Sequence, residues 1–170
     1  MRIERRSDAV ARRAREAAEQ TLVAEIMTRE VVTVRADLSV ESLVDLFLAR
    51  DLSRVPILDD RGVAVGIVAK TDVLRERQVH GDTVEEEIDD SLPPSRVGRS
   101  GFHTHATGAI VSDIMSRQVT SLPETATLAR AAEMMATDHL HAIVITARGG
   151  GMVGLLSPID IAAWVAGVQA

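Results

Sequence analysis

The chain contains no cysteine, no tyrosine and no asparagine, and its only aromatic residues are Phe47, Phe102 and Trp164. Without cysteine it can form no disulfide, thiolate nucleophile or cysteine-ligated metal site, and a reducing cytoplasm is the expected location. So few aromatic side chains also argue against a surface that stacks single-stranded bases. Because the formal net charge is −6 as well, nucleic acid is not expected as a partner.

Long apolar runs are missing too. No stretch approaches the roughly 20 residues that span a bilayer, so no membrane association is expected. Residues 1–20 lack the apolar stretch of a signal peptide. They are rich in alanine and arginine and predict a helix. Acidic residues interrupt the arginines, which favours a solvated helix packed on the core or on a second subunit over a polyanion-binding arm.

What the chain does contain is an internal repeat. Residues 23–31 (VAEIMTREV) return 88 positions later as residues 111–119 (VSDIMSRQV), and the same offset relates Asp72 to Asp160. Each copy is too short to bury much surface alone, so the two are expected to share one core. A cleft between two such copies, at a pseudo-twofold axis, is the expected place for a ligand.

Both copies show the pattern of a β-α-β-β-α unit, which predicts an α/β (α+β) fold. In the first copy we expect strands over residues 31–34, 54–58 and 63–68, with helices capped by Ser39 and Thr71. In the second we expect strands over residues 119–122, 142–146 and 152–156, with helices capped by Thr127 and Ser157. The apolar spacing of the last helix predicts a buried face made of Ile161, Trp164, Val165 and Val168.

The expected organisation has four parts. Residues 1–20 form the N-terminal helix, 21–78 the first repeat, 79–107 a linker or insert, and 108–170 the second repeat. Acidic runs, Pro93-Pro94 and scattered Gly and Ser mark the insert as a loop or a flexible segment.

The duplicated unit, with Ile-Met-Thr at residues 26–28 and GIVAKTD at residues 66–72, resembles a tandem pair of CBS (cystathionine-β-synthase) domains, or Bateman module. The resemblance implies two three-stranded sheets packed about a pseudo-twofold axis, with two clefts between the repeats. It further implies that an adenosine compound (AMP, ADP, ATP or S-adenosylmethionine) binds there, and that two such modules form a homodimer.

On this resemblance each cleft combines the terminal Asp of one copy with strands of the other, and the Asp holds the ribose hydroxyls. The first cleft would contain Asp72, Thr71, Ser116, Ser121, His141 and Ile143. The second would contain Asp160, Ser157, Thr28, Thr33, Ser53, Arg54 and Val55. Arg54 and His141 are candidates for phosphate contacts. The alternatives are that the two Asp residues only cap helices, that Arg54 is a solvated charge, and that His141 is a strand histidine.

The two clefts are expected to differ, because Arg54 corresponds to Ala142 and Ala69 to Ser157. No nucleophile–base pair or metal motif is evident: two His-x-His pairs lack further ligands at fixed spacing. The sequence therefore predicts a regulatory sensor and not an enzyme, with no required cofactor and no catalytic or metal site. The alternative is a ligand-independent dimeric scaffold that recruits a partner through the N-terminal helix or the insert.

Overall fold

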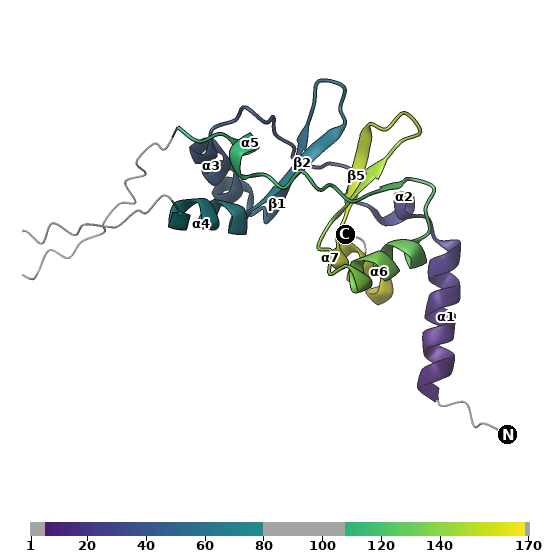
Figure 1. Cartoon of the computed structure of the whole chain (residues 1–170). Coiled ribbons are helices and arrows are strands. Elements are labelled where there is room, and N and C mark those ends of the chain that lie inside the picture. Colours follow the sequence, from purple (N-terminus) through teal and green to yellow (C-terminus); the bar gives the residue numbers. More distant parts are fainter. Residues whose placement is uncertain (1–5, 80–107, 169–170) are drawn as a thin grey trace, which may run out of the picture.

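The computed structural model describes residues 6–79 and 108–168 and divides them into two lobes (Figure 1). The expected insert lies almost wholly outside the described residues. The helices are α1 (Arg6–Gln20), α2 (Val23–Ile26), α3 (Val40–Arg50), α4 (Lys70–Val79), α5 (Val111–Ile114), α6 (Leu128–Thr137) and α7 (Pro158–Ala166). The strands are β1 (Arg54–Leu58), β2 (Ala64–Ala69), β3 (Ser121–Pro123), β4 (Ile143–Thr146) and β5 (Met152–Leu156). No helix within the described parts is long and apolar enough to cross a membrane.

The two sheets differ by one strand. In the second repeat β3 pairs in parallel with β4, which pairs antiparallel with β5; in the first, only β1 and β2 form a sheet. The strand expected over residues 31–34 is wrong, since Val34 alone bridges to Ile57. Proline explains the loss. Val144 N donates to Thr120 O at 3.0 Å, but the counterpart of Val144 is Pro56, which has no N–H to donate.

The helix starts follow the expected caps in three of four cases. Ser39, Thr127 and Ser157 each accept a hydrogen bond from a backbone N–H three residues on. The cap expected at Thr71 is wrong, because α4 begins at Lys70, directly after β2, and Thr71 is already inside the helix. There the Asp72 carboxylate accepts a hydrogen bond from Ala69 N at 2.8 Å.

The leading segment of each repeat lies in the lobe of the other repeat. Figure 1 shows α2 beside α7 and β5, while α5 lies beside α4 and β2. Thr28 and Leu155 exchange two backbone hydrogen bonds of 3.0 and 2.9 Å, and Ser116 and Ile67 exchange two of 2.9 and 3.0 Å. These pairs are related by the same 88-residue offset as the sequences, so the hydrogen bonds themselves follow the pseudo-twofold symmetry.

This exchange corrects the expectation of one shared core. The structure has two apolar clusters, and each is completed by the leading segment of the other repeat. The cluster of the second lobe contains Ala18, Val23, Met27, Leu128, Ala131, Met135, Ile143, Ile145 and Leu156. The cluster of the first lobe contains Val40, Leu43, Phe47, Val55, Ile57, Val68, Val73 and Val111. Neither repeat therefore buries a complete core by itself.

Each leading segment crosses a hairpin strand of the other repeat, and we call this contact a crossing. At each crossing a methionine packs against a glycine. A Cβ atom added to Gly154 would lie 2.5 Å from Met27 Sδ and 2.9 Å from the Thr28 carbonyl oxygen. At the counterpart site, a Cβ atom on Gly66 would lie 2.5 Å from Met115 Sδ. Glycine is thus required where the methionine of the Ile-Met motif crosses the hairpin strand.

We expect Gly154→Ala to lower the free energy of unfolding by about 1–3 kcal/mol, because the backbone of Thr28 cannot withdraw without breaking its bridge to Leu155. The control is Gly149→Ala, in the neighbouring turn, where an added Cβ meets nothing within 4 Å. That variant should remain within about 0.5 kcal/mol of the parent. Urea denaturation followed by circular dichroism measures both; equal effects would show that the crossing is not tightly packed.

Candidate ligand-binding site

Asp160 is the one buried charged side chain of the described residues, with 6% of its surface exposed. It occupies the first turn of α7, three residues after the N-cap Ser157. Its Oδ2 accepts hydrogen bonds from Ser157 N and Ser157 Oγ, both at 2.6 Å, and its Oδ1 accepts one from Thr28 Oγ1 at 3.1 Å. The crossing thus places Thr28 of the first repeat against Ser157 and Asp160 of the second, as the sequence predicts.

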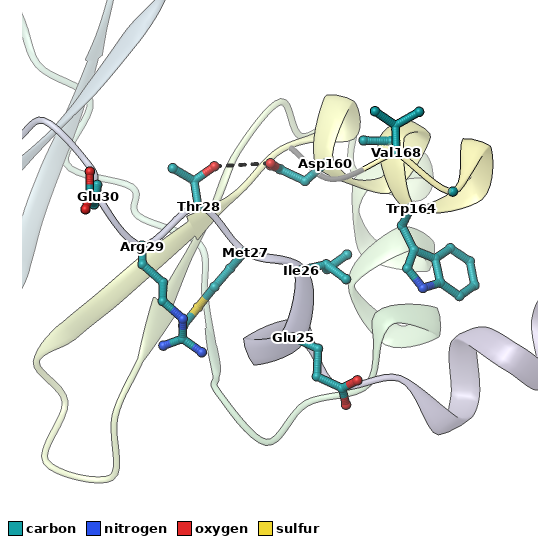
Figure 2. A pocket seen from close by; sticks show the side chains of 11 residues that line it. Glu25, Ile26, Met27, Thr28, Arg29, Glu30, Asp160, Trp164 and Val168 are labelled. Atoms are coloured by element: carbon teal, nitrogen blue, oxygen red, sulfur yellow. Dashed lines mark hydrogen bonds between the residues drawn. The ribbon is translucent and has the colours of Figure 1, made fainter.

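A groove of about 630 Å³ opens beside this carboxylate, between α2 and α7 (Figure 2). We call it the Asp160 groove. Its lining residues are Glu25, Ile26, Met27, Thr28, Arg29, Glu30, Asp160, Ala163, Trp164, Gly167 and Val168. The volume suits a small molecule, and the walls combine hydroxyl and carboxylate groups with an apolar side.

Asp72, the counterpart of Asp160, has fewer partners. Its Oδ2 accepts from Ala69 N at 2.8 Å and its Oδ1 pairs with Arg75 at 3.5 Å, with 20% of the side chain exposed. Alanine at position 69 supplies no hydroxyl, unlike Ser157. A carboxylate offers about four acceptor positions. Asp160 has three of them filled, whereas Asp72 retains at least two, enough for both hydroxyls of a ribose.

A second, smaller pocket of about 220 Å³ lies between the repeats, and we call it the Arg54 pocket. Its lining residues are Arg54, Ile67, Gln118, Val119, Thr120, His139, Leu140, His141, Ala142 and Val144. The sequence assigns Arg54 to the cleft of Asp160; the structure instead places it with His141. Arg54 and its counterpart Ala142 both line this pocket, which puts the pocket near the pseudo-twofold axis.

The remaining candidates lie in several settings. Val55 and Ile143 are fully buried, which leaves only their backbone for a ligand. Ser53, Thr71, Ser116 and Ser121 are exposed and Thr33 is half-buried. Neither of the two pockets above is lined by any of these seven residues.

The sequence pattern missed the walls of the Asp160 groove. Trp164 is half-buried and lines the groove, while Val165 and Val168 are 71% and 62% exposed. The buried face expected for this helix is therefore wrong for those two valines. For Val168 the reason is that α7 ends at Ala166, followed by Gly167 with φ of 69°, so that Val168 leaves the helical register. Val165 lies within α7 and is exposed there. Within residues 6–79 and 108–168, no three His, Asp or Glu side chains gather as metal ligands.

Comparison with known families identifies the two repeats. The model of the CBS domain matches residues 23–78 and again residues 111–167. Among curated proteins, the uncharacterized protein MK0525 of Methanopyrus kandleri is 34% identical over 70 residues, which are 41% of this chain and 36% of that protein. Inosine-5′-monophosphate dehydrogenase of Methanocaldococcus jannaschii is 34% identical over 56 residues, which are 33% of this chain and 11% of that enzyme. The matches thus span only about a third or less of these relatives.

Solved structures share the fold over most of the chain. The CBS domain of the bacterial CNNM/CorC family Mg²⁺ transporter in complex with ATP has a TM-score of 0.70 and 19% identity, covering 95% of this chain and 99% of that one. The CBS domain pair of protein MJ0100, in complex with 5′-methylthioadenosine and S-adenosyl-L-methionine, has a TM-score of 0.65 and 18% identity, covering 86% and 97%. CBSX2 in complex with AMP has a TM-score of 0.66 and 17% identity, covering 88% and 99%. Similarity at this level establishes the fold, and it confirms the α+β tandem arrangement.

The hydrogen bonds predict unequal structural roles for the two carboxylates. Asp160→Ala should lower the free energy of unfolding by about 2–3 kcal/mol, because it removes a buried carboxylate that accepts three hydrogen bonds, two from Ser157 and one from Thr28. Asp72→Ala, which removes mainly one capping interaction, should cost about 1 kcal/mol. Chemical denaturation of both variants tests this difference, and an equal or larger loss for Asp72→Ala would contradict it.

Proposed function

The chain belongs to the CBS domain family, and from that premise we propose that it is a regulatory module that binds an adenosine-containing ligand between its two repeats. The observation that carries the proposal is the crossing, which brings Thr28 from one repeat to Asp160 of the other at the wall of a groove of about 630 Å³. A ligand in that groove touches both repeats at once. Its binding energy can therefore favour one relative position of the repeats over another.

The ligands of the related structures support this class of molecule. The proteins with this fold bind ATP, AMP, or 5′-methylthioadenosine with S-adenosyl-L-methionine. All of these carry a ribose, and here two carboxylates at helix starts are available for ribose hydroxyls. Asp72 has the larger unfilled acceptor capacity, so we assign it the stronger ribose contact, with Thr71 and Ser116 as neighbouring hydroxyls. For Asp160 the corresponding neighbours are Ser157 and Thr28.

The phosphate and the base of the ligand are assigned to other residues. Arg54, with His141, is suited to a phosphate, because a guanidinium can hold two phosphate oxygens in its plane. The backbone around Val55 and Ile143 supplies hydrogen bonds to a base edge. Ser53 just before β1, Ser121 at the start of β3 and Thr33 beside the single bridge residue Val34 are further hydroxyls. The module acts by binding and not by catalysis. It acts as a homodimer in the cytoplasm.

Isothermal titration of the chain with AMP, ADP, ATP and S-adenosylmethionine tests the proposal. We expect heat from at least one of them with a dissociation constant below the millimolar range. Asp72→Ala should weaken one binding event by about tenfold or more, because it removes charge-assisted hydrogen bonds to the ribose. The matched control is Asp45→Ala, an exposed carboxylate on α3, which should leave binding unchanged.

Absence of heat and of any thermal shift with all four compounds at millimolar concentration would rule out the sensor. It would favour the scaffold interpretation, in which the exposed helix α1 recruits a partner. α1 extends beyond the lobe that it contacts (Figure 1), and Ala18 is its one buried side chain among residues 9–20.

A further inference from the structure

The two pockets between the repeats carry opposite charge. Glu25, Glu30 and Asp160 line the Asp160 groove against one cation, Arg29. Arg29 Nη2 donates to the Ala24 carbonyl at 2.7 Å, and Glu25 Oε1 accepts from Leu22 N at 3.1 Å, so the cation and one carboxylate are both held by the backbone and the net charge of the lining stays negative. Figure 2 shows the Arg29 side chain extending away from Asp160. The groove therefore presents a negative surface to whatever it binds.

The Arg54 pocket has the reverse composition. Arg54 is joined there by His139 and His141, and no carboxylate lines the pocket. A phosphate carries close to two negative charges at neutral pH. It is attracted to this pocket and repelled by the Asp160 groove, where each carboxylate within about 6 Å opposes it.

The groove also has an aromatic wall that its counterpart lacks. Trp164 packs partly against the core of the second lobe and lines the groove, on the same side as Ile26 (Figure 2). In the first repeat the position of Trp164 is held by Glu76, and that of Ala163 by Arg75. An indole can stack on a purine base, and it attracts a cation placed over its face.

We propose that the Asp160 groove selects a phosphate-free adenosine compound, uncharged or carrying a sulfonium cation, whereas phosphorylated nucleotides bind outside this groove, with their phosphate at the Arg54 pocket. This inference rests on the proposed function and deepens it, because it divides the adenosine ligands into two classes by charge. Trp164 and Glu30 are the specificity-determining residues: the indole favours the base or the cation, and the exposed carboxylate disfavours phosphate.

Tryptophan fluorescence measures binding in this groove directly, because Trp164 is the only tryptophan of the chain. Its fluorescence should be titrated with 5′-methylthioadenosine, S-adenosylmethionine, AMP and ATP on the full chain. We expect the two phosphate-free compounds to change the emission at concentrations about tenfold lower than AMP or ATP. Glu30→Gln should narrow this difference, whereas Glu41→Gln, the matched control on α3 in the other lobe, should leave it unchanged.

Calorimetry on two further variants separates the pockets. Arg54→Ala should weaken AMP about tenfold and leave 5′-methylthioadenosine unaffected, and Trp164→Phe should do the reverse. If AMP or ATP changes the emission at the same concentrations as the phosphate-free compounds, and Glu30→Gln has no effect, the charge selection is wrong while the adenosine sensor stands. If no compound gives either heat or a change in emission, the proposed function fails together with this inference.

Discussion

The structure depends on the exchange of leading segments between the repeats. Met27 crosses Gly154, and the next residue, Thr28, is fixed to Leu155 by two backbone hydrogen bonds. The same chain segment completes the apolar core of the second lobe through Val23 and Met27. Because Leu155 lies five residues before Asp160, the crossing that closes the core also sets Thr28 against the carboxylate. The candidate site is thus a direct product of the packing, and its position cannot shift without disturbing the core of the second lobe.

Much of this arrangement could be predicted from the sequence, because it follows from features that repeat. The common offset and the three helix caps come from matched positions, whereas the meeting of Thr28 with Asp160 follows from the resemblance to CBS domain pairs. The predictions fail where a single residue type changes the backbone hydrogen bonding. Pro56 removes the N–H that its counterpart Val144 uses, so a strand with good β-branched residues remains a single bridge. The location of Arg54 could not be predicted from the sequence either. Arg54 lies near the pseudo-twofold axis, where it lines the same pocket as its counterpart Ala142.

Helical periodicity has a similar limit at the Asp160 groove. Spacing alone places Trp164 on the apolar face of the last helix, and the indole does pack partly against the core. Spacing does not reveal that α2, from the other repeat, covers only part of that face, nor that Gly167 ends the helix early. The exposed remainder of the face becomes one wall of the groove. The helix face that the sequence pattern predicts to be buried therefore belongs partly to the core and partly to a candidate binding surface.

The crossing also explains why two copies of one unit can have unequal sites. Its hydrogen bonds are made by the backbone, so they persist whatever side chains surround them. The positions that the crossing constrains are identical in the two copies: methionine at 27 and 115, and glycine at 66 and 154. The positions around the pockets are under no such constraint, and there the copies differ, with Ser157 against Ala69 and Trp164 against Glu76. Duplication gives the two copies the same backbone arrangement. Substitutions around the pockets then leave Asp160 with three acceptor positions filled by hydrogen bonds and Asp72 with fewer filled.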